Sequence, residues 1–385
     1  MKVLLTGGGT GGHITPLLAV AQKLKDLDPS TEVVYVGERG TRFASMTAGQ
    51  NAFDSQYKVF AGKFRRYNGE SWLTRLFDIK TNLLNLRDVF YLAFGLVESW
   101  FLLRKLKPDV ILLKGGFVGV PIGLAARNRI PLVTHDSDAL PGLANRLVSR
   151  WAVYHATGMP AEFYQYPKDK VKYIGVIVSD AYQPVTPGLT KEYRQALGIP
   201  VDAQVLMITG GSLGSQEINT TIASFASHLL TAMPKLYIVH QVGRRNTDVY
   251  GDFTNDRLEV HGLLEYNKLH QYSGAADVIV TRAGASMIAE FGIQGKACIV
   301  IPNPLLTGGH QVKNADFLQK NEAAVVLDEK LLTTNPEILK KTVSDLLNHA
   351  NQREKLGQNL QKITVVGAAD NLAKILLSVG KRTGE

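Results

Sequence analysis

The feature that most constrains the fold is a glycine-rich turn that occurs twice, once in each half of the chain. Residues 3–13 read VLLTGGGTGGH and residues 205–215 read VLMITGGSLGS. Each is a short apolar run followed by glycines and then by a segment of helical character. This order is typical of a buried parallel strand that leads into a helix N-terminus, where backbone N–H groups suit a diphosphate. The repeat predicts an α/β fold of two Rossmann-like, doubly wound domains that face each other across a cleft.

The bulk composition fits a cytoplasmic globular protein. The chain has 385 residues, 45% of them hydrophobic and 20% charged, which is enough for two or three domains. A single cysteine, Cys298, excludes a disulfide framework and indicates a reducing compartment. Because Cys298 lies in the apolar run 297–301, we expect it to be a buried strand residue. No signal peptide is expected at the N-terminus.

A transmembrane helix is not expected either. The best candidate, residues 89–103, contains Glu98 and is shorter than the roughly 18 residues that a span requires. The chain is nevertheless basic, with a net charge of +9. It shows no nucleic-acid recognition signature, so we expect no nucleic-acid partner.

Part of the positive charge is local. Between residues 62 and 87 basic side chains alternate with aromatic ones, and the basic set is Lys63, Arg65, Arg66, Arg75, Lys80 and Arg87. Basic residues beside exposed aromatics are attracted to an anionic membrane surface. A solvated basic face over the edge of the core would have the same composition, and both interpretations stay open.

The order of apolar runs predicts the domain boundaries. In the first half, strands expected at 3–5, 32–36, 110–113 and 132–135 alternate with helices, as in a parallel sheet. The pattern predicts an N-terminal domain over residues 1–158, a proline-rich linker over 159–188 and a second domain over 189–366. Residues 367–385 are predicted to form a final amphipathic helix and tail. The pattern leaves open whether this helix packs on the N-terminal domain.

Three segments of the second half suit a nucleotide sugar. The turn that contains Gly211 and Ser212 offers backbone and hydroxyl donors to phosphate. Glu290 falls two turns into a helix that follows the strand expected at 278–280, where a carboxylate can accept both hydroxyls of a ribose. Gln311 follows a loop rich in Pro and Gly, and an amide both donates to and accepts from sugar hydroxyls. Two alternatives stay open: Glu290 is a solvent-facing helix residue, and Gln311 belongs to a capped helix start that binds no ligand.

Candidate catalytic residues fall in the first half. His13 closes the first glycine turn, where it has the chemistry of a general base, although a histidine that merely ends a turn is an equal alternative. Asp136 and Asp138 end the strand expected at 132–135, and they either polarise a hydroxyl or cap the next helix. We expect no metal site, because no His, Asp or Glu set has convincing ligand spacing.

Taken together, these motifs resemble those of the family 28 GT-B glycosyltransferases over essentially the whole chain. The segments 8–13, 115–119 and 210–215 are similar to the family's three glycine loops. Residues 282–290 and 310–315 match its nucleotide-sugar signature in order and spacing. The resemblance implies an inverting N-acetylglucosaminyltransferase of peptidoglycan synthesis. Such an enzyme moves N-acetylglucosamine from UDP-N-acetylglucosamine to the muramyl C4 hydroxyl of undecaprenyl-diphospho-muramoyl-peptide (lipid I to lipid II).

The same resemblance assigns roles to individual residues. In the C-terminal domain it implies that the donor is held by Gly211, Ser212, Leu264, Arg282, Ala285, Ser286, Glu290 and Gln311. In the N-terminal domain it implies that the lipid diphosphate is held by Thr10, Gly11, Gly12, Gly115, Gly116 and Asp138. His13 would be the base and Asp136 a second catalytic residue. No cofactor is implied, and the protein would lie peripherally on the cytoplasmic face of the cell membrane.

Two segments depart from the family pattern. Residues 135–138 read HDSD where the family usually has HEQN, and residues 175–179 read GVIVS where it usually has GNPVR. Ser179 therefore stands where an arginine would face the donor phosphate. These departures leave open a different lipid acceptor such as diacylglycerol, or a non-catalytic nucleotide-sugar-binding subunit. A nucleotide-sugar 2-epimerase is disfavoured, because it needs several catalytic acids and only Asp136 and Asp138 are available.

Overall fold

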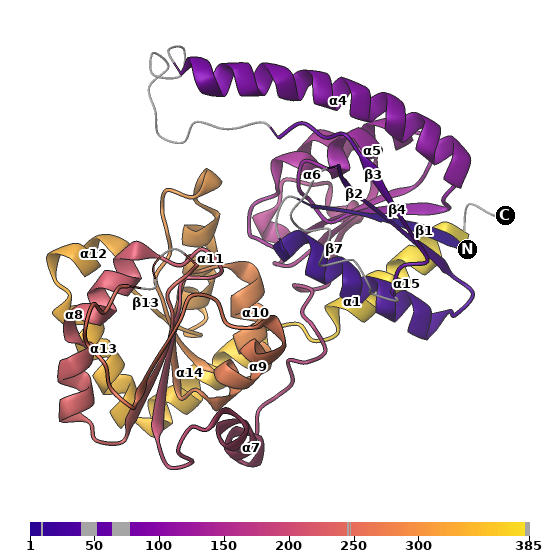
Figure 1. Ribbon diagram of the computed structural model, residues 1–385. Coiled ribbons are helices and arrows are strands. Elements are labelled where there is room, and N and C mark those ends of the chain that lie inside the picture. Colours follow the sequence, from indigo (N-terminus) through magenta and orange to yellow (C-terminus); the bar gives the residue numbers. More distant parts are fainter. Residues whose placement is uncertain (9–10, 40–51, 64–77, 245, 247, 382–385) are drawn as a thin grey trace. The chain divides into compact units, whose positions relative to one another are not determined.

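Two compact units make up the chain (Figure 1). The computed structural model describes residues 1–8, 11–39, 52–63, 78–244, 246 and 248–381, with only the backbone described at 11–13, 266 and 307. Unit 1 comprises Met1–Ser179 together with Gly367–Glu385, and unit 2 comprises Asp180–Val366.

Unit 1 is built on a parallel sheet of seven strands within the described residues. Their order across the sheet is β3 (Ser55–Val59), β2 (Glu32–Glu38), β1 (Lys2–Thr6), β4 (Val110–Leu113), β5 (Leu132–Asp136), β6 (Ala152–Thr157) and β7 (Val171–Tyr173). Every neighbouring pair is parallel. The chain winds outward in opposite directions from β1, so the switch point of the sheet lies between β1 and β4.

The strands of unit 1 are buried on both faces, which explains their continuous apolar sequence. In β1, Val3 and Leu5 face one core and Leu4 faces the other, as the two-residue period of a strand requires. The first face is covered by α1 (Gly11–Leu27) and α15 (Ala368–Lys381), and the second by α4 (Ile79–Leu106) and α5 (Gly119–Ala126). The short helices of unit 1 are α6 (Leu143–Val148), η1 (Ser149–Trp151), η2 (Ala161–Phe163) and η3 (Lys168–Lys170).

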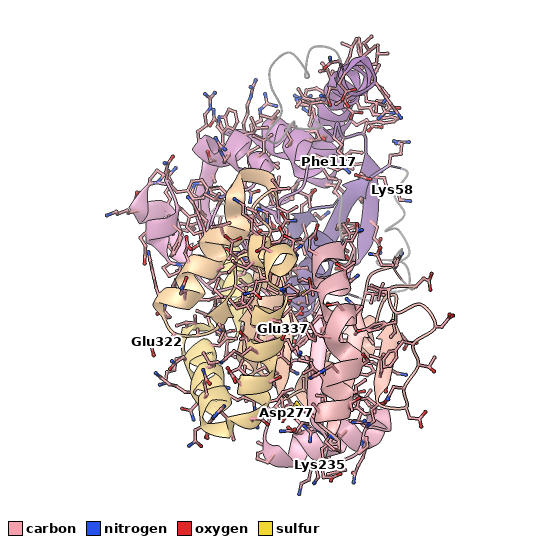
Figure 2. The ribbon with its side chains drawn as sticks, turned by 90° about the vertical axis from the view of Figure 1, so that its left-hand side faces the viewer. Lys58, Phe117, Lys235, Asp277, Glu322 and Glu337 are labelled. Atoms are coloured by element: carbon pink, nitrogen blue, oxygen red, sulfur yellow. The ribbon has the colours of Figure 1, made fainter. Side chains whose placement is uncertain are left out.

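Unit 2 repeats this architecture with six parallel strands among the residues described. Their order is β10 (Leu258–His261), β9 (Leu236–Gln241), β8 (Gln204–Thr209), β11 (Val278–Thr281), β12 (Ala297–Val300) and β13 (Val325–Val326). The switch point lies between β8 and β11. At the amino ends of these strands, Asp277 (labelled in Figure 2) accepts hydrogen bonds from the backbone N–H of Val205 (2.7 Å) and from Nη2 of Arg194 (2.9 Å).

Helices also cover both faces of the second sheet. One core contains side chains of α7 (Pro187–Leu197), α9 (Tyr266–Ala275), α10 (Ala285–Ile293), α11 (His310–Lys320) and α14 (Ala350–Ile363). The other contains side chains of α8 (Gln216–Ala232), α12 (Glu329–Thr334) and α13 (Glu337–Asn348). A short turn of helix, η4 (Thr307–Gly309), precedes α11. Cys298 is fully buried in β12, as predicted.

The predicted fold class, two doubly wound α/β domains, is confirmed, but three strands of unit 1 were not predicted. These are β3, β6 and β7. The strand β7 and residues up to Ser179 belong to unit 1, although the sequence predicts a linker there. β7 is a mostly exposed strand of three residues with no apolar run, so its sequence does not mark it as a strand.

One stretch, Ala350–Lys381, passes the length and composition test for a membrane span. The structure divides it into α14 and α15, with Gly367 between them in a left-handed conformation (φ 77°). Leu372 and Leu376 of α15 are fully buried in the core of unit 1. The apolar character of this stretch is therefore explained by core packing.

Candidate functional site

The carboxyl edge of the unit 2 sheet begins with the glycine turn after β8. Gly214 adopts φ 74°, and a Cβ there would lie 1.9 Å from the carbonyl oxygen of Val242. Gly243, in the turn after β9, is equally crowded against the backbone of Leu213. Only glycine fits these close approaches, so the two neighbouring turns are held together through their backbones. Ser215 then caps α8 by accepting a hydrogen bond from Ile218 N–H.

A buried amide, Gln241, fixes the same edge. Its Nε2 donates to Oγ1 of Thr209 (3.0 Å) and to the carbonyl of Gly211 (3.2 Å), and its Oε1 accepts from Leu264 N–H (3.0 Å). One side chain thus connects the loops that follow β8 and β10. Gln241 was not predicted from the sequence, although a polar residue at the end of an otherwise apolar strand was an available signal. Because the Leu264 N–H bonds Gln241, that donor is already engaged.

The start of α10 is open to an anion. Gly284 is its N-cap and has no side chain with which to cap the first-turn N–H groups of Ala285, Ser286 and Met287. Nδ2 of Asn314 donates to the carbonyl of Ala283 (2.9 Å) and fixes the preceding loop. This arrangement presents backbone donors and a helix dipole at the switch point of the sheet.

Glu290 lies on the same helix and is buried, 8% exposed. Burial raises the pKa of its carboxyl group to about 8, and a hydrogen bond with Tyr182 only partly opposes this shift. A buried carboxyl that lacks a cationic partner favours its protonated form. A ligand whose hydroxyl groups donate hydrogen bonds to the ionised carboxylate would therefore stabilise that form. Glu290 is therefore not a solvent-facing helix residue, which was the alternative prediction.

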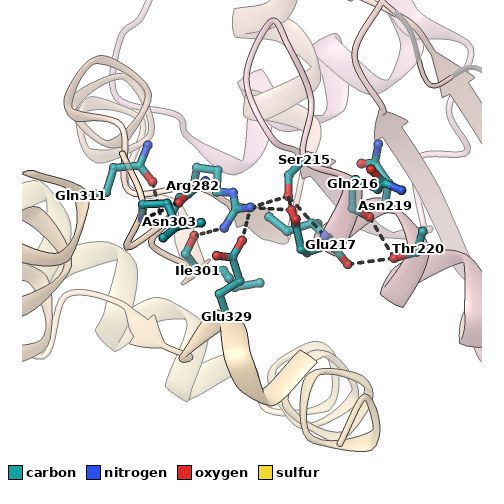
Figure 3. Close-up of polar contacts among 12 residues, drawn as sticks. Ser215, Gln216, Glu217, Asn219, Thr220, Arg282, Ile301, Asn303, Gln311 and Glu329 are labelled. Atoms are coloured by element: carbon teal, nitrogen blue, oxygen red, sulfur yellow. Dashed lines mark hydrogen bonds and ion pairs between the residues drawn. The ribbon is translucent and has the colours of Figure 1, made fainter. Parts of the chain in front are cut away.

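Arg282 is placed in an ion network rather than toward open solvent (Figure 3). Its guanidinium donates to Oγ of Ser215 (2.6 Å), to Oε2 of Glu217 (3.0 Å) and to the carbonyl of Ile301 (3.2 Å), and it pairs with Glu329. This network joins the loops after β8, β11 and β12. Arg282 is only 6% exposed, so the structure gives it the geometry of a residue that positions the N-terminus of α8.

Gln311 begins the next helix along this edge. Its Oε1 accepts a hydrogen bond from the backbone N–H of Asn303 (2.9 Å), and Figure 3 shows its Nε2 pointing away from that contact. Ser212, by contrast, lies exposed in the glycine turn after β8. Gly211, Ser212, Ala285, Ser286, Glu290 and Gln311 all follow neighbouring strands, so the topology brings them to one edge of unit 2.

The glycine turns of unit 1 meet in the same way. Gly116 adopts φ 76°, and a Cβ there would lie 2.2 Å from the carbonyl oxygen of Gly8. Gly115 also has a positive φ of 95°. The turns after β1 and β4 are thus in backbone contact at the switch point. Thr10 lies outside the described residues, and Gly11, Gly12 and His13 form the first turn of α1, where only the backbone is described.

Asp136 is buried at the end of β5 and satisfied by three neighbours. Oδ1 accepts from Gly142 N–H and from Nδ2 of Asn145, both at 2.9 Å, and Oδ2 accepts from the hydroxyl of Tyr166 at 2.9 Å. Burial nevertheless raises its pKa. Gly142 is the N-cap residue of α6, so Asp136 fixes the chain at the point where it enters this helix. Asp138 is half-buried two residues later.

Lys114 is a second residue of this kind that was not predicted from the sequence. It follows β4 directly, is 3% exposed, and donates from Nζ to Oγ of Ser137 at 2.9 Å. Burial lowers its pKa to about 8, opposed by the charges of Asp136 and Asp138. The available signal was a charged residue between an apolar strand and two glycines. Within the described residues, no group of three His, Cys, Asp or Glu is arranged to hold a metal ion.

Two Rossmann-like units, each with glycine turns at the switch point of its sheet, define the GT-B class. The solved structure of MurG from Acinetobacter baumannii matches with a TM-score of 0.72 at 23% identity, over 98% of this chain and 99% of that one. A Staphylococcus aureus MnaA–UDP structure matches with a TM-score of 0.65 at 14% identity, over 98% of each chain. These structural matches establish the fold alone.

The sequence comparisons are more specific. The glycosyltransferase family 28 N-terminal domain matches residues 3–156 and the family 28 C-terminal domain matches residues 205–372, so the chain belongs to glycosyltransferase family 28. A relative from Acetivibrio thermocellus is 30% identical over 99% of both chains, and one from Clostridium perfringens strain SM101 is 33% identical over 97% of both. Both are named UDP-N-acetylglucosamine–N-acetylmuramyl-(pentapeptide) pyrophosphoryl-undecaprenol N-acetylglucosamine transferase.

Proposed function

We propose that the chain transfers N-acetylglucosamine from UDP-N-acetylglucosamine to the muramyl hydroxyl of an undecaprenyl-diphosphate-linked acceptor, the lipid I to lipid II step of peptidoglycan synthesis. One observation carries this proposal: relatives named for this reaction match at 30–33% identity over nearly the whole length of both chains. Both halves of the family pattern are present in order, so the chain has the parts that a donor and an acceptor each require.

The donor is assigned to unit 2. The uncapped first turn of α10, with Ala285 and Ser286, supports a diphosphate site together with the turn at Gly211 and Ser212. Glu290, in the second turn of the helix that presents the diphosphate donors, is assigned to the ribose hydroxyls, and Gln311 to the sugar. Leu264 is assigned to the segment beside the uracil, through groups other than its engaged N–H. Arg282 acts on the site through Ser215 and Glu217.

These assignments give a direct displacement with inversion. Negative charge develops on the departing UDP, and the N–H groups and positive dipole end of α10 stabilise it where it forms. His13, at the first glycine turn of unit 1, is assigned as the base that takes the proton of the acceptor hydroxyl. Asp136 already accepts three hydrogen bonds, which supports a role in positioning the loop before α6 over a role in proton transfer.

A peripheral position on the cytoplasmic face of the membrane completes the proposal. Seven large apolar residues of α4 recur at intervals of three or four and are 55–68% exposed: Ile79, Leu83, Leu86, Phe90, Phe94, Val97 and Phe101. The opposite face of α4 contains its buried residues, including Gly95, Ser99 and Leu103. This apolar stripe extends for about 33 Å and suits insertion into a lipid interface. Most of the basic and aromatic segment 62–87 lies outside the described residues.

The test is transfer of radiolabelled N-acetylglucosamine from its UDP donor to a soluble lipid I analogue, measured with EDTA present. Transfer by the wild-type chain supports the proposal. Glu290→Ala is expected to weaken UDP binding at least tenfold, and His13→Ala to lower kcat with nearly unchanged donor affinity. A Glu290→Ala chain that binds UDP as the wild type does would overturn the ribose assignment.

A second function uses the same donor with diacylglycerol as the acceptor. It is favoured by the HDSD segment at 135–138, which departs from the family pattern at the acceptor edge of unit 1. The same assay with diacylglycerol in detergent micelles separates the two functions. UDP-N-acetylglucosamine binding without transfer to either acceptor would support a non-catalytic nucleotide-sugar-binding subunit instead.

A further inference from the structure

Lys114 occupies the central position at the carboxyl edge of the unit 1 sheet. It is the first residue after β4, and its backbone N–H donates to the carbonyl of Thr6 (2.9 Å), so it extends the pairing of β4 with β1. The side chain is 3% exposed. A lysine is rarely so buried without a partner of opposite charge. Its burial at the switch point therefore calls for a specific explanation.

The charges of the neighbouring carboxylates Asp136 and Asp138 offset part, but not all, of the cost of burying this cation. In the described part of the chain, the hydrogen bond of the Lys114 ammonium goes to a hydroxyl, Oγ of Ser137, at 2.9 Å. The carboxylate of Asp136 takes its three hydrogen bonds from Gly142, Asn145 and Tyr166. An ammonium carries three protons, and a single hydroxyl accepts one of them. The site is thus poorly compensated for a buried cation.

The backbone around Lys114 points to the class of ligand. The two residues that follow it, Gly115 and Gly116, have positive φ angles of 95° and 76° and bring the turns after β4 and β1 into contact. The turn leads into α5, where the N–H groups of Gly119 and Val120 donate to the carbonyls of Gly116 and Phe117 (3.3 and 3.2 Å). A buried cation beside a glycine turn of positive φ is a combination that binds a phosphate oxygen.

We infer that Lys114 is a binding residue for the diphosphate of the lipid-linked acceptor, anchored for that contact by Ser137. The identity of this ligand rests on the proposed function, because the acceptor is the substrate assigned to unit 1. Ser137 belongs to the segment in which the chain departs from the family pattern. Lys114 and Ser137 therefore form a cation–hydroxyl pair that links the second glycine turn to that altered segment.

Binding rather than turnover tests this inference. Farnesyl diphosphate is the probe, titrated calorimetrically into the full chain while saturating UDP occupies the donor site. Lys114→Met keeps the apolar stem and removes the charge, and it is expected to weaken probe binding at least tenfold with UDP affinity unchanged. Lys168→Met is the matched control, because Lys168 is an exposed lysine of the same unit, and it should bind both ligands within twofold of the wild type.

Two results overturn the inference: probe binding by Lys114→Met that equals the wild type, or a loss of UDP binding in place of probe binding. The second result would assign the cation to the donor's phosphate. Where Lys114→Met does not fold, Ser137→Ala takes its place, since it removes the anchor and keeps the ammonium. Unchanged probe binding in Ser137→Ala would then be the contradicting result. Probe binding that depends on Lys114 in a chain without transferase activity would uphold the inference and reject the proposed function.

Discussion

The protonation of Glu290 has a consequence for stability that substitution can reveal. Its pKa rises from 4.5 to about 8 on folding because the carboxyl is buried. Between these values the unfolded chain has lost the proton and the folded chain keeps it, so stability falls as pH rises through this window. Below about pH 4.5 both states are protonated and nothing is lost. The burial of Glu290 therefore lowers the free energy of unfolding at neutral and alkaline pH. It also leaves a carboxyl group that can bind a ligand in its ionised form.

The prediction concerns Glu290→Gln, which keeps the shape of the side chain and removes its ionisation. We expect the variant to melt several degrees above the wild type at pH 9, since each pH unit inside the window is worth roughly 1.4 kcal/mol. At pH 5, near the lower end of the window, the difference in melting temperature should be much smaller. Thermal unfolding without nucleotide, measured across pH 5–9, checks this. A difference in melting temperature that is constant with pH would show that the carboxyl is already ionised in the folded state.

The glycine turns make a second prediction at the residue scale. Gly214→Ala places a Cβ 1.9 Å from the carbonyl oxygen of Val242 at φ 74°. We expect it to cost about 3 kcal/mol or more of unfolding free energy and to weaken UDP binding, because the turn must move. Gly251→Ala is the control: Gly251 also has a positive φ (54°), but no atom lies within 4 Å of its Cβ position. Urea unfolding should show a cost of only about 1 kcal/mol for Gly251→Ala.

Individual residues also show how far sequence alone reaches into the site. The glycine turns and the place of Glu290 on a helix were predictable, because a turn needs positive φ and a helix position follows from the preceding strand. The Lys114–Ser137 contact was not, since it joins residues 23 apart that meet only because β4 and β5 are neighbours. The network around Arg282 likewise depends on Glu329, which is distant in the sequence.

At the scale of elements, predictability follows burial. The central strands β1, β8, β11 and β12 are buried on both faces and were predictable from their apolar runs. In β3 the sequence SQYKV contains mostly half-buried and exposed positions, so no apolar run marks it. The helix α4 is the opposite case. Many of its large apolar residues are exposed on the surface of a helix of 28 residues. In the sequence, these residues make the segment 89–103 resemble a short membrane segment.

The apolar stripe of α4 is expected to govern membrane binding without affecting folding. Replacing Leu83, Phe90 and Phe94 together by serine should reduce partitioning onto vesicles that contain anionic lipid at least tenfold. The melting temperature should change little, because all three side chains are exposed. Vesicle sedimentation measures the first quantity and calorimetry the second.

A matched control separates the stripe from general surface hydrophobicity. Leu147, Leu305 and Val366 are exposed apolar residues outside α4, and replacing all three by serine removes a similar apolar area. This control should sediment with vesicles as the wild type does. Equal losses in both triple variants would mean that α4 has no special part in membrane binding.

At the scale of the whole molecule, unit 1 is assembled from both ends of the chain. The helix α15 packs on α1, and Leu372 and Leu376 are fully buried in the core that also contains Leu17 and Val20. The final helix was predictable from its amphipathic pattern. The sequence left its destination open, because the pattern shows which face is apolar but not which core receives it. Unit 1 therefore cannot complete its core until residues beyond unit 2 have been synthesised.

This discontinuity predicts where a core mutation should act. Leu372→Ala removes a fully buried side chain of α15 and should cost about 2–5 kcal/mol. Although Leu372 lies close to unit 2 in sequence, hydrogen exchange should accelerate in strands β1–β7 and in α1, with unit 2 unchanged. Leu346→Ala, on α13 of unit 2, is the reciprocal control and should accelerate exchange only between residues 180 and 366. If Leu372→Ala loosened β8–β13 instead, α15 would belong energetically to the second unit, and the N-terminal unit would have to be stable without it.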